Sequence, residues 1–134
     1  MSEEEALNKA LIDALAAAPA VVALVGTRVF DQVPKNATWP YVEIGDMRAV
    51  PDGGGCAAGQ EIFVALTVHS KAVGQREARA VAGALRAALH EQPLVMPAPF
   101  TLVDGEVVAV LTRRNERNPE ISEGLVSYRA LVEG

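Results

Sequence analysis

A glycine-rich segment at residues 50–59 is the part of the sequence that most resembles a ligand-binding motif. Gly53, Gly55 and Ala58 match the G-x-G-x-x-A spacing with which dinucleotide-binding loops approach a pyrophosphate. That motif follows a strand and opens a helix, because the helix N-terminus binds the phosphate. Here the segment leads into a predicted strand, so we do not expect a dinucleotide site.

A second glycine spacing in the same segment is that of a P-loop, in which backbone N–H groups surround a phosphate. Gly54 and Gly59 are separated as this motif requires. The next two residues are Gln60 and Glu61, however, where a P-loop has Lys and then Ser or Thr. The sequence therefore argues against a nucleotide ligand. We interpret the segment as a loop that becomes ordered at a protein interface.

Side chains suited to metal binding or nucleophilic catalysis are few and scattered. Cys56 is the only cysteine, which excludes an intrachain disulfide, and no cationic neighbour in the sequence marks it as reactive. His69 and His90 lack partners at metal-ligand spacing, and His90 is placed to complement the C-terminus of a predicted helix. No nucleophile-elbow motif contains any of the serines, which are Ser2, Ser70, Ser122 and Ser127. We expect no metal, no cofactor and no catalytic activity.

One local cluster of positive charge interrupts an otherwise acidic chain. Arg113, Arg114 and Arg117 alternate with Glu116 and Glu120 in a predicted turn. The cluster lacks the interleaved aromatic side chains on which proteins stack single-stranded nucleic acid. Two interpretations remain open: a solvated hairpin tip, or a surface that forms salt bridges between subunits.

The overall composition describes one domain covering residues 1–134, with a core built from aliphatic side chains. Half of the residues are hydrophobic and only 4% are aromatic, while the formal net charge is -5. An acidic chain is a poor candidate for binding nucleic acid. The acidic start lacks the basic residues of a secretory signal, so we expect synthesis in the cytoplasm. The uncharged run at residues 14–27 is shorter than the ~20 residues of a membrane-spanning helix, so we expect no membrane partner.

The residues at 60–91 predict a strand followed by a helix, around which the domain is organised. Four alternating apolar residues mark one face of the strand, and they are Ile62, Val64, Leu66 and Val68. The helix is predicted to begin at a cap formed by Gly74, with Glu77 reaching back to the capping amide, and to end near Glu91. Its apolar stripe must pack on a sheet.

The remaining segments add a first helix and further strands. Ser2 and Glu5 form a capping-box pattern, and Pro19 closes that helix before a short turn at residues 20–25. Strands are predicted at residues 28–30, 41–48, 100–103, 106–111 and 125–132, with a bulge or a close backbone approach at Gly45 and a tight turn at Asp104 and Gly105. This order predicts an α+β domain: a mostly antiparallel β-sheet with two main helices packed on one face.

Six short stretches in this order carry a resemblance that covers nearly the whole chain. They are residues 23–30, the loop with Pro34, residues 39–45, residues 68–70, the helix after Gly74, and residues 128–130. Together they resemble the tail-completion or tail-terminator proteins of long-tailed phages and gene transfer agents, formerly a domain of unknown function. The glycine-rich segment is less typical of that family. The matching residues are structural, with Gly26 permitting a turn and Pro40 fixing the start of a strand.

The resemblance implies a structural virion protein with no catalytic residues. Such proteins cap the growing tail tube, end its polymerisation and join the tail to the head connector as a ring, typically a hexamer. The implied partners are further copies of the chain, the tail-tube protein and the connector or stopper protein, with DNA only passing through the lumen. The implied location is the head-proximal end of the tail of a phage-like particle, after synthesis in the bacterial cytoplasm.

The two loops at residues 50–59 and 113–124 are the expected carriers of these contacts. The candidate interface residues are Asp52, Gly53, Gly54, Gly55, Arg113, Arg114, Glu116 and Arg117. Two other classes of function remain as alternatives. One is a cytoplasmic adaptor or protein-interaction domain that belongs to no particle, and the other is a small enzyme with an unrecognised site.

Overall fold

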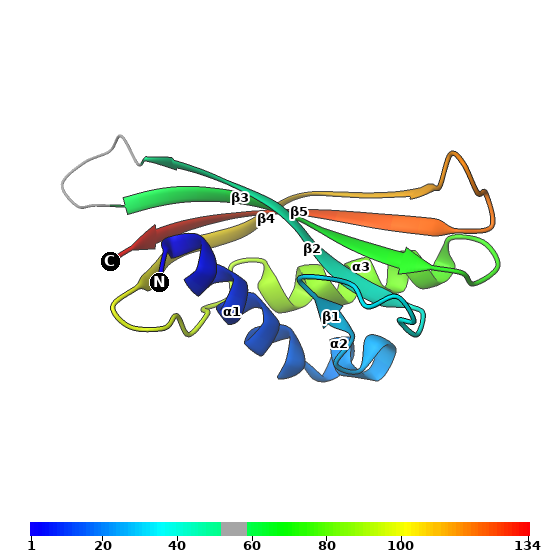
Figure 1. The fold of residues 1–134 in the computed structure, drawn as a ribbon, viewed down its shortest axis with the longest axis horizontal. Helices are drawn as coiled ribbons and strands as arrows, with labels where there is room; N and C mark the ends of the chain where they lie inside the picture. Colours follow the sequence, from blue (N-terminus) through cyan, green and yellow to red (C-terminus); the bar gives the residue numbers. More distant parts are fainter. Residues whose placement is uncertain (52–58) are drawn as a thin grey trace.

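A five-stranded sheet covered by helices on one face forms the domain (Figure 1). The computed structural model describes residues 1–51 and 59–134. In chain order the elements are α1 (Glu3–Ala16), α2 (Pro19–Val25), β1 (Val29–Phe30), β2 (Tyr41–Pro51), β3 (Gly59–Ser70), α3 (Arg76–Leu89), β4 (Thr101–Arg114) and β5 (Ser122–Glu133). The strand order is β1-β2-β3-β5-β4. The α+β class is confirmed, but the sheet is mixed rather than purely antiparallel, because β1 runs parallel to β2.

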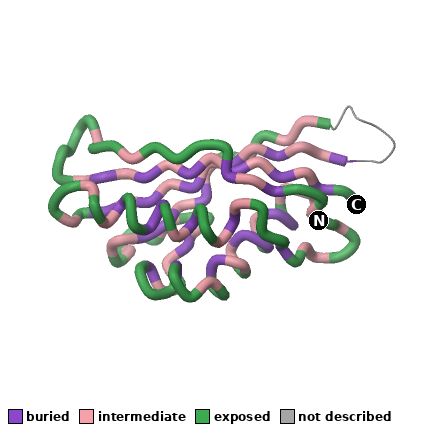
Figure 2. Tube along the Cα trace, turned by 180° about the vertical axis from the view of Figure 1, so that it is seen from behind, coloured by how far each residue is buried: buried purple, intermediate pink, exposed green. Residues whose placement is uncertain are grey.

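Alternate residues of the central strands β3 and β5 face the helices and form the core (Figure 2). The buried residues of these two strands include Ile62, Val64, Leu66, Val68, Val126, Tyr128, Ala130 and Val132. Leu7, Leu11 and Leu15 of α1 join the same cluster, as do Leu85 and Leu89 of α3. The period of two predicted for both strands is therefore confirmed. Burial of one face fixes the strand register, since a slip of one residue would expose every core side chain.

The two long helices begin in different ways. At α1 the predicted capping box is confirmed: the Glu5 N–H donates to Ser2 Oγ at 3.1 Å, and the Ser2 N–H donates to Glu5 Oε2 at 2.8 Å. At α3 the predicted cap is wrong. Gln75 is the N-cap residue without a side-chain bond, while Glu77 accepts a hydrogen bond from buried Ser70 Oγ at 2.7 Å. Gly74 has a φ of +73° and precedes the cap.

The β4 strand differs from the sequence prediction. Asp104 and Gly105 do not form a turn between two strands, because β4 continues through them and pairs with β5 along its length. Gly105 instead allows a close approach, since an added Cβ would lie 2.1 Å from Tyr128 Oη. Register shifts after Leu102 and after Val107 bend the strand, and the predicted bulge at Gly45 of β2 is confirmed.

The N-terminal helices α1 and α2 are apolar, which raises the question of whether either is long enough to span a membrane. Among the described residues, no single helix is long and apolar enough to cross a membrane, and α1 and α2 reach that length only together, across a bend of 84°.

The contact between Gly105 and Tyr128 predicts that Gly105→Ala destabilises the domain. Because the added methyl also meets Leu102 Cδ2 at 3.2 Å, buried side chains must shift, at a cost of about 1–3 kcal/mol. Gly83 in α3 is the matched control, because no described atom lies within 4 Å of an added Cβ there. Gly83→Ala should stabilise the helix by roughly 0.5–1 kcal/mol. Urea unfolding measures both, and shifts of the same sign would contradict the packing argument.

Burial of Tyr128 predicts a loss of stability at alkaline pH. Burial, and secondarily the charge of Asp104, raise the pKa of the Tyr128 phenol to about 12. Because the neutral form is favoured in the folded state, the stabilisation is complete below pH ~10 and is lost as the pH rises through the folded pKa. Tyr128→Phe should therefore flatten the fall in the free energy of unfolding above pH ~10.

The same substitution should have little effect at neutral pH. Within the described part of the chain the Tyr128 hydroxyl has no hydrogen-bond partner, so Tyr128→Phe removes no bond and should change the free energy of unfolding by less than about 1 kcal/mol. Tyr41 remains in both proteins as an internal reference. An identical alkaline profile for the two proteins would contradict the assignment.

Candidate functional site

The two segments predicted to carry contacts leave the sheet at opposite ends (Figure 1). Paired residues place Pro51, the last residue of β2, beside Gln60 at one end. At the other end Arg114, the last residue of β4, pairs with Ser122 of β5. The strand β3 runs the length of the sheet in 12 residues, so the two ends are about 40 Å apart. Asp52, Gly53, Gly54 and Gly55 lie outside the described residues.

The turn between β4 and β5 is organised by two asparagines. Asn115 Oδ1 accepts hydrogen bonds from the N–H groups of Arg117 and Asn118, at 2.9 and 3.0 Å. Asn118 Oδ1 accepts one from the Glu120 N–H at 3.2 Å. The charges of this segment predicted a turn, but the hydrogen bonds that its asparagines make were not predicted. Their known preference for turns was the signal that would have found them.

The predicted charged residues gather around this turn. Arg113, Arg114, Glu116 and Arg117 are all exposed. Arg113, Glu116 and Arg117 line one shallow pocket together with Glu123 of β5. Arg113 Nε lies 3.2 Å from Glu123 Oε1, directly across the strand pair. Arg113 is therefore engaged within the subunit, while Arg114 and Arg117 present their charges at this end of the sheet.

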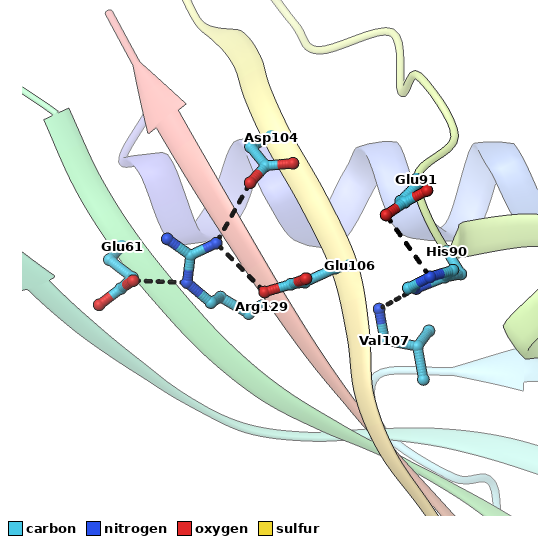
Figure 3. A network of polar contacts seen from close by, with 7 residues as sticks. All are labelled: Glu61, His90, Glu91, Asp104, Glu106, Val107 and Arg129. Carbon is cyan, nitrogen blue, oxygen red and sulfur yellow. Dashed lines mark hydrogen bonds and ion pairs between the residues drawn. The ribbon is translucent and has the colours of Figure 1, made fainter.

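A network centred on Arg129 lies on the face of the sheet opposite the helices (Figure 3). Its guanidinium forms ion pairs with Glu61 of β3 and with Asp104 and Glu106 of β4, the last two at 3.4 and 3.6 Å. The hydrogen bond to Glu61 raises the pKa of Arg129, against the lowering effect of burial. Three strands are thus linked on this face by one cation and three carboxylates. The sequence did not predict this network, since its members are far apart in the chain.

Both histidines make contacts within the fold. His90 is the C-cap residue of α3, and its ring is bonded to β4, where its Nδ1 accepts a hydrogen bond from the Val107 N–H at 3.1 Å (Figure 3). That the ring complements the charge of the helix C-terminus stays a prediction. His69 Nε2 lies 3.0 Å from Glu43 Oε1, and its ring stacks on Tyr41. Across residues 1–51 and 59–134, no group of three or more His, Cys, Asp or Glu side chains is arranged to hold a metal ion.

Comparisons with protein families and with solved structures both found matches to this chain. Among curated proteins, none matches this chain. Among solved structures, the chain is similar to one in a structure described as the virion of a native gene transfer agent particle, with 30% sequence identity. The match covers 98% of this chain and 97% of that chain, with a TM-score of 0.87. The family model described as tail completion protein gp17 matches residues 9–133, and the chain therefore belongs to the tail completion protein gp17 family.

Proposed function

We propose that this protein caps the tail tube of a phage-like particle, ends its polymerisation and joins the tail to the head connector as a ring. Membership of the tail completion family and the virion match support a structural role in such a tail. The observation that carries the finer proposal is the placement of the two contact segments at opposite ends of the sheet. A joining protein must present one surface to each of two different partners.

In the proposed ring, one end of every subunit meets the tail-tube protein and the other meets the connector or stopper protein. The end segments are the β2–β3 loop, with candidate contacts at Asp52, Gly53, Gly54 and Gly55, and the β4–β5 turn, with candidates Arg113, Arg114, Glu116 and Arg117. Six copies around the tube axis are the number we propose. We propose that the protein is made in the bacterial cytoplasm and is then located in the particle, at the head-proximal end of the tail.

The sheet face without helices is suited to line a lumen through which DNA passes. The ion pairs on this face leave an excess of negative charge, because Arg129 contacts three carboxylates while Arg113 contacts only Glu123. A surface of this kind releases few counterions on meeting DNA and so binds phosphates weakly. Weak binding would let DNA move along the lumen. Only subunits assembled in the proposed ring would line a lumen with this face.

Mixing the purified chain with the tail-tube protein of the same particle tests the proposal. Negative-stain microscopy should show rings, or tubes that carry this protein at one end only, and light scattering on each protein alone gives its starting size. Added before polymerisation, the chain should shorten the tubes. A chain that forms no rings and leaves tube length unchanged would instead support an adaptor domain that belongs to no particle.

A deletion separates the two ends of the subunit. Removing residues 53–58 joins Asp52 directly to Gly59, which leaves a two-residue Asp-Gly connection beside the paired residues Pro51 and Gln60. Because Asp-Gly is a favoured hairpin turn, the monomer should keep its fold and unfolding temperature to within a few degrees. Capping or connector binding should be lost, as measured by microscopy and co-sedimentation.

The matched change at the opposite end is Arg114→Glu combined with Arg117→Glu, which reverses exposed charges without touching the Arg113–Glu123 pair. The deletion and the double substitution should each abolish binding to a different partner. If both variants lose the same partner, the assignment of one end to each partner is wrong. If the deletion variant still supports normal tails, the β2–β3 loop makes no essential contact.

A further inference from the structure

Strand β4 is a long exposed edge of the sheet. It spans 14 residues and pairs only with β5, so that no described strand lies along its outer side. Large apolar side chains along it are half exposed, namely Val103 (51%), Val108 (51%), Val110 (42%) and Leu111 (53%). An edge of this length offers unpaired backbone N–H and C=O groups to another strand. Its apolar exposure indicates a surface that is covered in the working assembly.

The opposite edge of the sheet is only half covered. β1 pairs with β2 at two positions, Val42 and Glu43. From Asp46 to Pro51 the outer side of β2 therefore has no partner among the described strands. The sheet consequently has one open edge on β4 and one on the second half of β2.

These two edges run in opposite directions. Each step from β2 to β3, β5 and β4 reverses the chain direction, so β2 and β4 are antiparallel to one another. Rotation of a subunit about an axis along the strands leaves these directions unchanged. The β4 edge of one copy would then meet the β2 edge of the next as an antiparallel pair. Such a contact uses two different patches, and a heterologous interface of this kind gives a ring when the rotation between neighbouring copies closes.

The charges on the two edges are complementary at the same level of the sheet. Following the paired residues inward from β2, Arg48 lies level with Phe63, then Arg129, then Glu106. On the β4 side, Arg129 is a single cation among three carboxylates, which leaves excess negative charge.

On the β2 side, Arg48 is exposed and its guanidinium carbon lies 5.7 Å from the centre of the Phe63 ring. No carboxylate in residues 1–51 or 59–134 forms an ion pair with it.

We propose that β4 of one copy pairs antiparallel with residues 46–51 of a second copy, and that Arg48 of the second copy joins the carboxylates around Arg129 of the first. This inference rests on the proposed ring and names the surface that closes it. The added cation reduces the excess negative charge of the cluster, and the strand pairing covers Val108 and Leu111. Charge complementarity selects this partner over the edge strand of an unrelated protein.

Charge reversal tests the contact with the full chain. Arg48→Glu should weaken self-association by about tenfold or more, since it places a carboxylate against three others. Adding Glu106→Lys to that variant leaves two cations and two carboxylates in the Arg129 cluster of each copy. The new lysine then lies opposite the new glutamate of the next copy, which restores opposite charges across the edge. The double variant should regain self-association to within about threefold of the native chain.

Analytical ultracentrifugation measures association, with and without tail-tube protein. Arg86→Glu makes the same charge change on the exposed side of α3, which covers the other face of the sheet from Arg48 and Arg129, and should leave association unchanged.

The outcomes separate this inference from the proposed function. Rings or capped tubes that form equally well with Arg48→Glu would overturn the edge contact and leave the capping role standing. Self-association that follows the charge pattern without any capping of tubes would support the contact and overturn the capping role. A native chain that neither self-associates nor caps tubes would overturn both. An equal loss in Arg86→Glu would also overturn the contact, because the effect would then reflect net charge alone.

Discussion

Burial of one face of the β3–β5 strand pair beneath α1 and α3 is the constraint on which the other features depend. The alternating residues of these strands, with Tyr128 the largest fully buried side chain, leave only one register in which the core is closed. That register sets which residues of the outer strands lie level with one another. It sets Phe63 level with Arg129, and the pairing of β4 with β5 then places Glu106 beside Arg129.

The sequence predicted those elements whose pattern is local. The period of two in β3 and β5, the apolar stripe of α3 and the capping box at Ser2 each need only a short window of residues, and each is confirmed. The prediction that Asp104 and Gly105 break β4 into two strands was wrong, because Asp-Gly is a strong turn signal when considered alone. What overrides it is Tyr128, a residue 23 positions later, whose ring needs the space that Gly105 leaves.

The candidate site likewise has a part that the sequence predicted and a part that it did not. The charged turn was found because Arg113, Arg114, Glu116 and Arg117 are adjacent in the chain, although only the structure pairs Arg113 with Glu123. The Arg129 network draws on three strands, and its members look like ordinary solvent-facing charges when each strand is considered separately. Pairing order decides that they meet. A single sequence contains no direct signal for that order, since β5 inserts between β3 and β4.

The strand order also has a consequence for the time at which a subunit becomes available. Strand β5 follows β4 in the chain but is an interior strand, so β4 has no place in the sheet until β5 has paired with β3. A nascent chain that does not yet contain β5 therefore lacks the finished outer edge, together with the ion pairs that link β4 to its neighbours. Synthesis of β5 thus acts as a checkpoint: a chain without β5 has no formed β4 edge, and only a chain that contains it presents both edges of the sheet at once.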